Sequence, residues 1–422
     1  MNPHNRTATW LRRALMFCLA TGATAALAQT VIVPPPVHEP PPPGPQRSGQ
    51  AETDSVEEMA IGEALQPRDL FQWGPVRLHP GVSYRFMYGE GIRTRVGRTD
   101  ETIIQTLTPG IRADIGDRWH FNYRANMSFY SDSAFEDSVG HSFNFGGGTT
   151  YEAWSFGFSQ SGHISSEVHT ETARQTDEQD YNTSLTAGYQ INSLYSLDLS
   201  VRQHVRVIEG FTSSVGNAWT WSTMDWLNLQ LTPYLATSIG LGAGYTDVEH
   251  GSDMTFQEAR GRVGLQLTKK LNLSANAGAE IRQFRDSDKD PKVSPVFGVT
   301  ASYHPIEPTT ISLSARRSIA ASHFRDQITE RTSLTLNLSQ RLLLRYHLGV
   351  SGGIHYSTYE ASSSMGTGGR EDTQTFLSTS LGTALLRRGS ISVFYSISRN
   401  TSNRTGFDYT SNQMGFQVSY SY

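Results

Sequence analysis

The stretch GFQVSYSY, residues 415–422, ends the sequence with a strict alternation of residue character. Phe416, Val418, Tyr420 and Tyr422 are apolar or aromatic, and small or polar residues stand between them. Alternation with a period of two indicates a strand with one apolar and one polar face. Chain termini usually fray in water. Regular alternation up to the last residue therefore suggests a strand held by neighbours on both sides, as in a sheet that closes on itself.

The same alternation recurs from Val76 onward, in segments of about ten residues that read as strands. Clear examples are residues 119–129, 181–191, 195–201, 271–281 and 297–303. Short and long connections between these segments alternate along the chain. The short connections are 115–118, 192–193, 231–234, 268–270 and 387–389, and the long ones include 165–180, 248–254, 285–292 and 357–372. This division predicts about eighteen strands.

Short turns at one end and long loops at the other are typical of bacterial outer-membrane barrels. We therefore predict an all-β fold, a transmembrane antiparallel up-and-down β-barrel over residues 76–422. Only 37% of the residues are hydrophobic, yet the chain has 18 Tyr and 19 Phe, which fits strands that are apolar on one side. A β-sandwich also alternates, but it does not require this asymmetry of connections. The sequence contains no repeat of constant period, so it does not indicate a propeller or a solenoid.

The N-terminal segments differ from the rest. Residues 1–28 combine a basic start with an apolar stretch ending in Ala-Leu-Ala, which predicts a signal peptide. Residues 29–75 are first proline-rich and then acidic, and we interpret them as a periplasmic linker. Beyond residue 28, no apolar run is long enough for a transmembrane helix. Cys18, the single cysteine, lies in the predicted signal peptide, so the mature chain would contain no disulfide. We expect localisation in the cell outer membrane.

Two features do not fit regular strands. Pro109 falls in the middle of a strand, where it removes a backbone donor, and the adjacent Gly110 predicts a bulge. Residues 146–148 are three consecutive glycines, which would weaken a strand unless they bend the wall or admit a close neighbour.

The final strand also carries expectations about partners. In lipid every backbone polar group needs an internal partner, so this strand must pair with the first one. We expect Phe416, Val418, Tyr420 and Tyr422 to lie at the membrane interface, and the terminal aromatic residue to be read by the outer-membrane assembly machinery. Outer-membrane lipid and lipopolysaccharide are the expected surroundings.

The layout resembles a known family. The stretch LFQWGPVRLHPGVSYRF (70–86) leads into the barrel, and residues 256–280 and 371–400 each pair two strands around a short turn. Over residues 70–422 this style is similar to the β-barrel porin type 2 family of Gram-negative outer membranes. The resemblance implies a porin-type barrel and, as for some members of that family, an association with exopolysaccharide export components. It implies no active-site residues.

Each alternating segment has two sets of positions, an apolar phase and a second phase between its residues. If the apolar phase faces lipid, the other phase lines the lumen. In that phase lie Arg85, Arg112, Arg124, Arg202, Arg206, Arg260, Arg262, Arg282, Arg316, Arg331 and Arg345. The acidic residues read in the same phase are Asp114, Glu152, Asp198, Glu258 and Glu280. Arginines in a confined aqueous pore lower the energy of a passing anion. We therefore predict a porin-like channel whose arginines select anionic solutes or acidic polysaccharide.

Two alternatives remain open. The arginines can instead pair with the five acids and fill a plugged or structural barrel, which would be an adaptor or export component. An outer-membrane hydrolase is the third reading, but no G-x-S-x-G or H-E-x-x-H motif is present. The sequence predicts no enzyme activity, no cofactor and no metal site. The net charge of −4 gives no footprint for nucleic acid.

Overall fold

The computed structural model describes residues 71–422, except 170, 173, 210–215, 286–288, 325–326 and 362–368. The predicted signal peptide (1–28) and the predicted linker (29–75), apart from its last five residues, lie outside the described residues. None of the described residues forms a helix long and apolar enough to cross a membrane.

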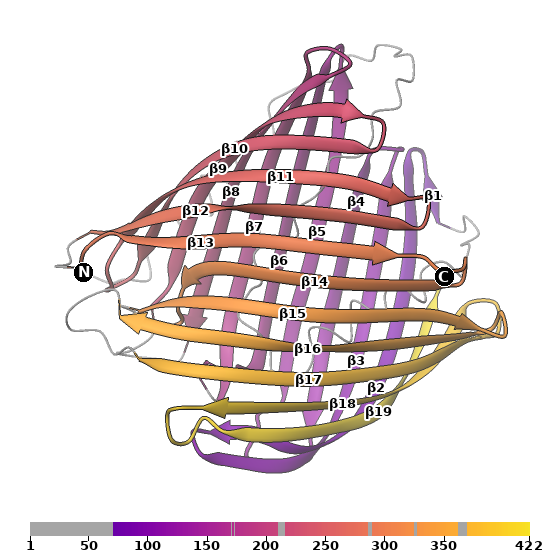
Figure 1. The fold of residues 1–422 in the computed structure, drawn as a ribbon. Helices are drawn as coiled ribbons and strands as arrows, with labels where there is room; N and C mark the ends of the chain where they lie inside the picture. The colour runs from indigo at the N-terminus through magenta and orange to yellow at the C-terminus, as the bar shows by residue number, and fades with distance from the viewer. Residues whose placement is uncertain are drawn as a thin grey trace. The chain divides into compact units, whose positions relative to one another are not determined.

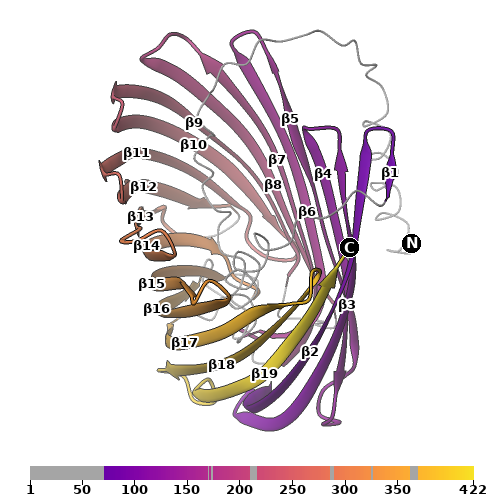
Figure 2. The ribbon, with the colours of Figure 1, turned by 90° about the vertical axis from the view of Figure 1, so that its right-hand side faces the viewer.

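Eighteen antiparallel strands, β2 to β19, form one closed ring (Figures 1 and 2). Each strand pairs with the next in sequence, and β19 pairs with β2 to close the ring. The strands are β1 (Gln72–Trp73), β2 (Val76–Arg95), β3 (Arg98–Ile115), β4 (Trp119–Tyr130), β5 (Ser138–Tyr151), β6 (Trp154–His169), β7 (Arg174–Gln190), β8 (Tyr195–Glu209), β9 (Ala218–Thr232), β10 (Leu235–Val248), β11 (Met254–Thr268), β12 (Leu271–Phe284), β13 (Lys292–Tyr303), β14 (Thr309–Ala321), β15 (Gln327–Leu342), β16 (Tyr346–Ala361), β17 (Arg370–Leu385), β18 (Gly389–Ser402) and β19 (Tyr409–Ser421). The predicted fold class and strand count are confirmed.

The exterior of the ring is apolar. Residues that lie opposite one another in adjacent strands share a face, and one face carries large hydrophobic side chains that remain exposed. Ile239 and Leu241 on β10 are 71% and 65% exposed, and Leu185, Leu336 and Val393 are also exposed. The other face carries mostly Ser, Thr, Asn, Gln and charged residues. An exposed apolar exterior around a polar interior is the pattern of a transmembrane barrel.

All five predicted short connections lie where the structure turns. They belong to one end of the ring, which we call the turn end. The connections at this end are 116–118, 152–153, 191–194, 233–234, 269–270, 304–308, 343–345 and 386–388, and β2 begins and β19 ends there too. The opposite end, with the remaining connections, is the loop end.

Of the four long loops predicted by residue range, 248–254 and 285–292 are confirmed as connections at the loop end, and the other two are wrong. Residues 165–180 were expected to form one loop, but β6 continues to His169 and β7 begins at Arg174. The expected loop 357–372 likewise contains the end of β16 and the start of β17. The strands β6, β7, β16 and β17 therefore have 16 or 17 residues each, more than the ~9–11 needed to cross a bilayer. Polar residues on both faces hid these extensions from the alternation pattern.

The bulge predicted at Gly110 is also absent. Val82 lies opposite Pro109 in a part of the ladder between β2 and β3 that has no register shift. Between β3 and β4 the pairs resume at Gly110 in the register that they had at Leu107. The Thr108 hydroxyl donates to Asn126 Oδ1 at 2.9 Å beside the interruption. Pro109 thus interrupts the pairing of β3 with β4 over a short stretch, but neither strand contains an extra residue there.

The triple glycine admits a close neighbour, as one of its two predicted roles required. A Cβ atom on Gly147 would lie 2.5 Å from the Trp119 ring and from the Arg118 carbonyl oxygen. The Trp119 ring therefore lies against the backbone of β5, where it stacks on Phe145 with centroids 5.3 Å apart.

The closing seam joins the two ends of the barrel sequence. Phe416 lies opposite Phe86, and their rings stack with centroids 5.5 Å apart. The Tyr422 amide donates to the Pro80 carbonyl at 2.9 Å, so the last residue is held by β2. The interface and assembly roles of Phe416, Val418, Tyr420 and Tyr422 stay predictions.

Gly415 should be sensitive to substitution because it lies in this seam. A Cβ atom there would lie 1.9 Å from the Phe86 carbonyl oxygen and 2.9 Å from the Phe394 ring. We expect Gly415→Ala to lower the free energy of unfolding by about 1–3 kcal/mol or to prevent folding. Gly264→Ala is the matched control, because no atom lies within 4 Å of its Cβ position. Urea unfolding in detergent micelles measures both variants, and equal stability of the two would contradict the seam.

Candidate functional site

The structure places ten of the eleven predicted arginines on the interior face. Cross-strand pairs connect them through the ring, for example Arg206 opposite Asp180 and Arg316 opposite Gly298. The ten are Arg85, Arg112, Arg124, Arg202, Arg206, Arg260, Arg262, Arg282, Arg316 and Arg331. Arg345 lies in the turn between β15 and β16. Their role in selectivity stays a prediction.

Four of these arginines form ion pairs with four of the five predicted interior acids. The closest nitrogen–oxygen distances are 3.1 Å for Arg112–Asp114, 2.5 Å for Arg260–Glu258, 3.0 Å for Arg262–Asp198 and 2.7 Å for Arg282–Glu280. Three of the pairs are two residues apart on one strand, where both side chains point to the same face. The fifth acid, Glu152, lies in the turn after β5. Four of the ten interior arginines are therefore locally neutralised, which is part of the pairing that the plugged-barrel alternative predicted.

The interior carries more acids than the sequence indicated. Glu178 and Asp180 were assigned to an outer loop, but they lie on β7 and face the interior. Asp180 Oδ2 is 2.6 Å from His204 Nε2, and Glu178 is buried. The excess of positive charge on the wall is thus smaller than predicted.

Arg202 differs from the paired arginines. It lies on β8 between Ser184 of β7 and Ser222 of β9. Among the described residues it has no carboxylate within ion-pair distance, and its side chain is only partly buried. Its charge therefore faces the lumen without a local counter-charge.

Burial of the interior side chains increases from the turn end to the loop end. On β12, Asn272 and Ser274 near the turn end are exposed, whereas Glu280 and Arg282 near the loop end are each 4% exposed. The lumen is therefore accessible at the turn end and packed at the loop end.

The packing comes first from the hairpin of β14 and β15. β13 pairs with β14 only from Tyr303 to Phe297. Beyond that point β14 continues to pair with β15 alone, up to Ala321 opposite Ile328. We call residues 318–331, described except for 325–326, the inward hairpin.

The inward hairpin bends away from the wall and into the barrel. Ile328 is 1% exposed and packs with Met254 and Val248, in a cluster that also includes Ile319 and Phe284. Met254 and Phe284 belong to the interior face of β11 and β12, as their register with Arg282 and Glu280 shows. An apolar face that would point to lipid in a regular wall is therefore buried against the interior face of the nearby strands β10 to β12.

His323, at the tip of the inward hairpin, is fully buried between two carboxylates. Its Nδ1 lies 2.9 Å from Glu171 Oε2, and its Nε2 lies 3.4 Å from Glu178 Oε2. The His323 amide also donates to Glu171 Oε1 at 2.9 Å. Glu171 follows β6 and Glu178 lies on β7, so this contact joins the hairpin tip to another part of the wall.

A second strand holds the same tip. Arg206 on β8 donates to the Ala321 carbonyl oxygen at 3.2 Å and to the Ser322 carbonyl oxygen at 2.5 Å. The Ser322 hydroxyl donates to Glu171. Arg206 was predicted as a pore-lining cation, but it is buried and binds backbone carbonyls of the hairpin.

The contacts in this cluster shift the pKa values of His323 and Glu171, which both lie in connections outside the strands. Burial alone would lower the pKa of His323, but the facing Glu171 and Glu178 carboxylates raise that pKa above its ordinary value. Burial alone would raise the pKa of Glu171, but His323, Ser322 and Arg206 hold that pKa well below its usual range. The two carboxylates therefore favour the protonated form of His323.

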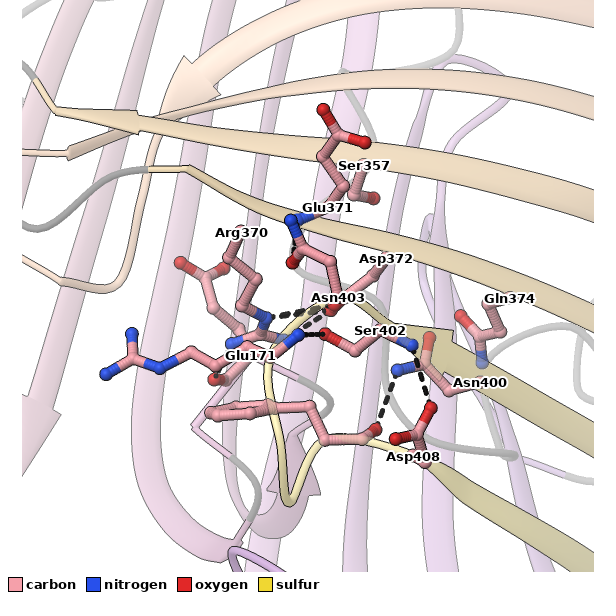
Figure 3. A network of polar contacts seen from close by, with 12 residues as sticks. Glu171, Ser357, Arg370, Glu371, Asp372, Gln374, Asn400, Ser402, Asn403 and Asp408 are labelled. Carbon is pink, nitrogen blue, oxygen red and sulfur yellow. Dashed lines mark hydrogen bonds and ion pairs between the residues drawn. The ribbon is translucent and has the colours of Figure 1, made fainter.

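A polar network ties further connections to the same place (Figure 3). The Arg370 guanidinium on β17 donates to the Glu171 carbonyl oxygen at 3.0 Å and to Asp372 Oδ1 at 3.0 Å. It also lies over the Phe407 ring at 3.7 Å, which brings in the connection between β18 and β19. Asn400 donates to the Phe407 carbonyl oxygen at 2.8 Å.

An apolar cluster adds to this filling of the lumen. Met87, Ile92, Ile104, Phe135, Val168 and Phe394 form one buried group. The sequence interpretation missed it, although Met87, Ile104 and Phe394 stand in the polar phase of their strands and are a visible departure from the pattern.

At the base of the inward hairpin, Glu330 of β15 spans the gap left between β13 and β14. It contacts Lys292 at 2.8 Å, Arg317 at 2.6 Å and the Ser294 hydroxyl at 2.8 Å. Lys292 also contacts Glu360 at 2.5 Å. This cluster, the base clamp, replaces the ladder bonds that β13 lacks there.

The Ser322–His323–Glu171 group does not resemble a hydrolase triad. The Ser322 hydroxyl donates to Glu171 rather than to the imidazole, and His323 is 0% exposed. A hydrolase needs a nucleophile bonded to its base within reach of substrate. No group of three or more potential ligand residues is placed to hold a metal within the described part of the chain.

No family model and no curated protein matches the chain. Similar solved structures include Pseudomonas aeruginosa OpdO, 12% identical, with 82% of this chain and 97% of that chain covered and a TM-score of 0.44. Acinetobacter baumannii OccAB4 is 10% identical, with 82% and 98% covered and a TM-score of 0.44. The Pseudomonas aeruginosa outer membrane protein opdK is 10% identical, with 82% and 98% covered and a TM-score of 0.41. At these identities and TM-scores the likeness assigns neither family nor function.

The base clamp predicts unequal effects of two glutamates. Glu330→Gln leaves Lys292 and Arg317 without their buried counter-charge, so we expect the free energy of unfolding to fall by about 1–3 kcal/mol. Glu360→Gln removes the 42%-exposed second partner of Lys292 and should change it by less than about 0.5 kcal/mol. Urea unfolding in detergent micelles measures both variants. Equal losses would show that Glu330 does not hold the hairpin base.

Proposed function

We propose that the protein is an outer-membrane channel for small anionic solutes, seen here with its loop end closed. The observation that carries the proposal is a polar, arginine-bearing interior enclosed by an apolar exterior. A barrel that only anchored a partner would not need partly exposed cations such as Arg202 inside its wall.

The orientation and surroundings follow from the connections. Bacterial barrels keep short turns in the periplasm, so the turn end faces the periplasm and the loop end faces outward. The exterior contacts outer-membrane lipid, with lipopolysaccharide around the loop end, and the assembly machinery inserts the barrel. The predicted signal peptide delivers the chain across the inner membrane.

Anion preference depends on net charge rather than on the number of arginines. An arginine paired with a carboxylate contributes a local dipole, whose potential falls faster with distance than that of an isolated charge. Arg260 with Glu258 and Arg262 with Asp198 are such dipoles. Arg202 has no carboxylate partner in the described part of the chain and is partly exposed, so it should affect the selectivity more than the paired arginines do.

A plugged structural barrel is the second candidate, because the loop end is packed. The same packing argues against passage of an acidic polysaccharide in this state, since a polymer needs a continuous path wider than a small anion. The export role that the family resemblance implies would therefore require a larger opening of the loop end.

Reversal potential under a salt gradient tests the selectivity. We expect Arg202→Gln to move the reversal potential toward cation preference, because it removes an isolated positive charge from the lumen. The control is the double variant Glu258→Gln with Arg260→Gln, which removes a neutral pair and should leave the reversal potential nearly unchanged. The measurement is single-channel recording of the purified barrel in a planar bilayer.

An equal shift in both variants would contradict the assignment to Arg202. A silent bilayer from correctly folded protein under all conditions would favour the plugged barrel instead.

A further inference from the structure

We propose that the inward hairpin is a proton-operated gate, held closed by the His323 imidazolium between Glu171 and Glu178 and released when His323 loses its proton. This inference rests on the proposed channel function and concerns its regulation.

The charges at the hairpin tip balance. His323 is faced by Glu171 from the connection after β6, by Glu178 from β7 and by Arg206 from β8. The imidazolium and the guanidinium together offset the two carboxylates. Arg370 donates to the backbone carbonyl oxygen of Glu171 and forms an ion pair with Asp372.

Loss of the imidazolium proton leaves an uncompensated negative charge in a closed site. His323 is fully buried, and Glu171 and Glu178 are each about 5% exposed. A buried charge without its partner is strongly unfavourable. The cluster can regain hydration only if the tip moves away from Glu171 and Glu178.

The hairpin is built to move as a unit. From Ser318 onward β14 has no ladder to β13, so on that side no backbone hydrogen bonds between strands hold it in the wall. β14 and β15 remain paired with each other up to Ala321 and Ile328. The base clamp at Glu330 fixes the point about which the hairpin turns.

The direction of the pH dependence follows from the cluster. The pKa of His323 is raised in the closed state, so the closed state is favoured at pH values below its ordinary pKa and loses that advantage as pH rises through the raised pKa. The pKa of Glu171 is lowered, so its contribution is lost only in strong acid. The gate therefore opens as pH rises through the raised pKa of His323.

The wall offers a matched control. His204 on β8 also pairs with a carboxylate, with its Nε2 2.6 Å from Asp180 Oδ2. Its side chain is 29% exposed, and none of its described contacts reaches the inward hairpin. His204→Gln removes an imidazole from the interior face of the barrel but leaves the described contacts of the inward hairpin unchanged.

The experiment is single-channel recording of the mature protein from about pH 6 to about pH 10, a range that crosses histidine titration when the pKa is raised. Wild-type protein and His204→Gln should both open several-fold more often as pH rises. His323→Gln carries no charge at any pH, so it should be open already at about pH 6 and lose the pH step.

Heat-modifiable migration on gels confirms that each variant is folded. A pH step that persists in His323→Gln, or a wild-type conductance that does not change with pH, overturns the gate but leaves the channel intact. Silence of wild-type protein and His323→Gln at every pH overturns the channel as well.

Discussion

Backbone hydrogen bonding in lipid is the constraint on which the rest of this structure depends. Each strand must be paired along both edges where it crosses the hydrocarbon layer, because no water is available there. Closure of β19 on β2 meets that requirement and explains why the alternation continues to Tyr422. The interruption between β13 and β14 lies toward the loop end, where Lys292 and Glu330 provide polar contacts instead.

The same interruption connects the wall to the closed lumen. Once β14 is freed from β13, the hairpin can bend inward and bury Ile328 against Met254. Its tip then brings His323 to Glu171 and Arg206, which pack the loop end. The turn end keeps its interior accessible, as Asn272 and Ser274 show. The inward hairpin thus contributes to a barrel whose interior is accessible at the turn end and packed at the loop end.

The sequence predicted those features that depend on residues near one another in the chain, namely the alternation within strands and the residues of tight turns. The eighteen strands and the short turns were of this kind, because alternation and tight connections are local. The inward hairpin was not predictable, because Ile319 and Ile328 occupy ordinary lipid-facing positions in the pattern and only the three-dimensional bend buries them. The partners of the interior arginines depended on strand boundaries: extending β7 to Arg174 moved Glu178 from an expected loop into the lumen. A bulge at Gly110 was expected from composition, whereas the register of three strands excluded it.

The central claim is that the inward hairpin closes a channel, and shortening that hairpin tests it most directly. A variant in which residues 318–331 are replaced by a short turn keeps the pairs between Arg317 and Thr332 and below, so the ring stays closed. In a planar bilayer, its single-channel conductance should exceed that of the full-length barrel several-fold, with longer open periods. An unchanged conductance from correctly folded protein would contradict the claim that this hairpin closes the lumen.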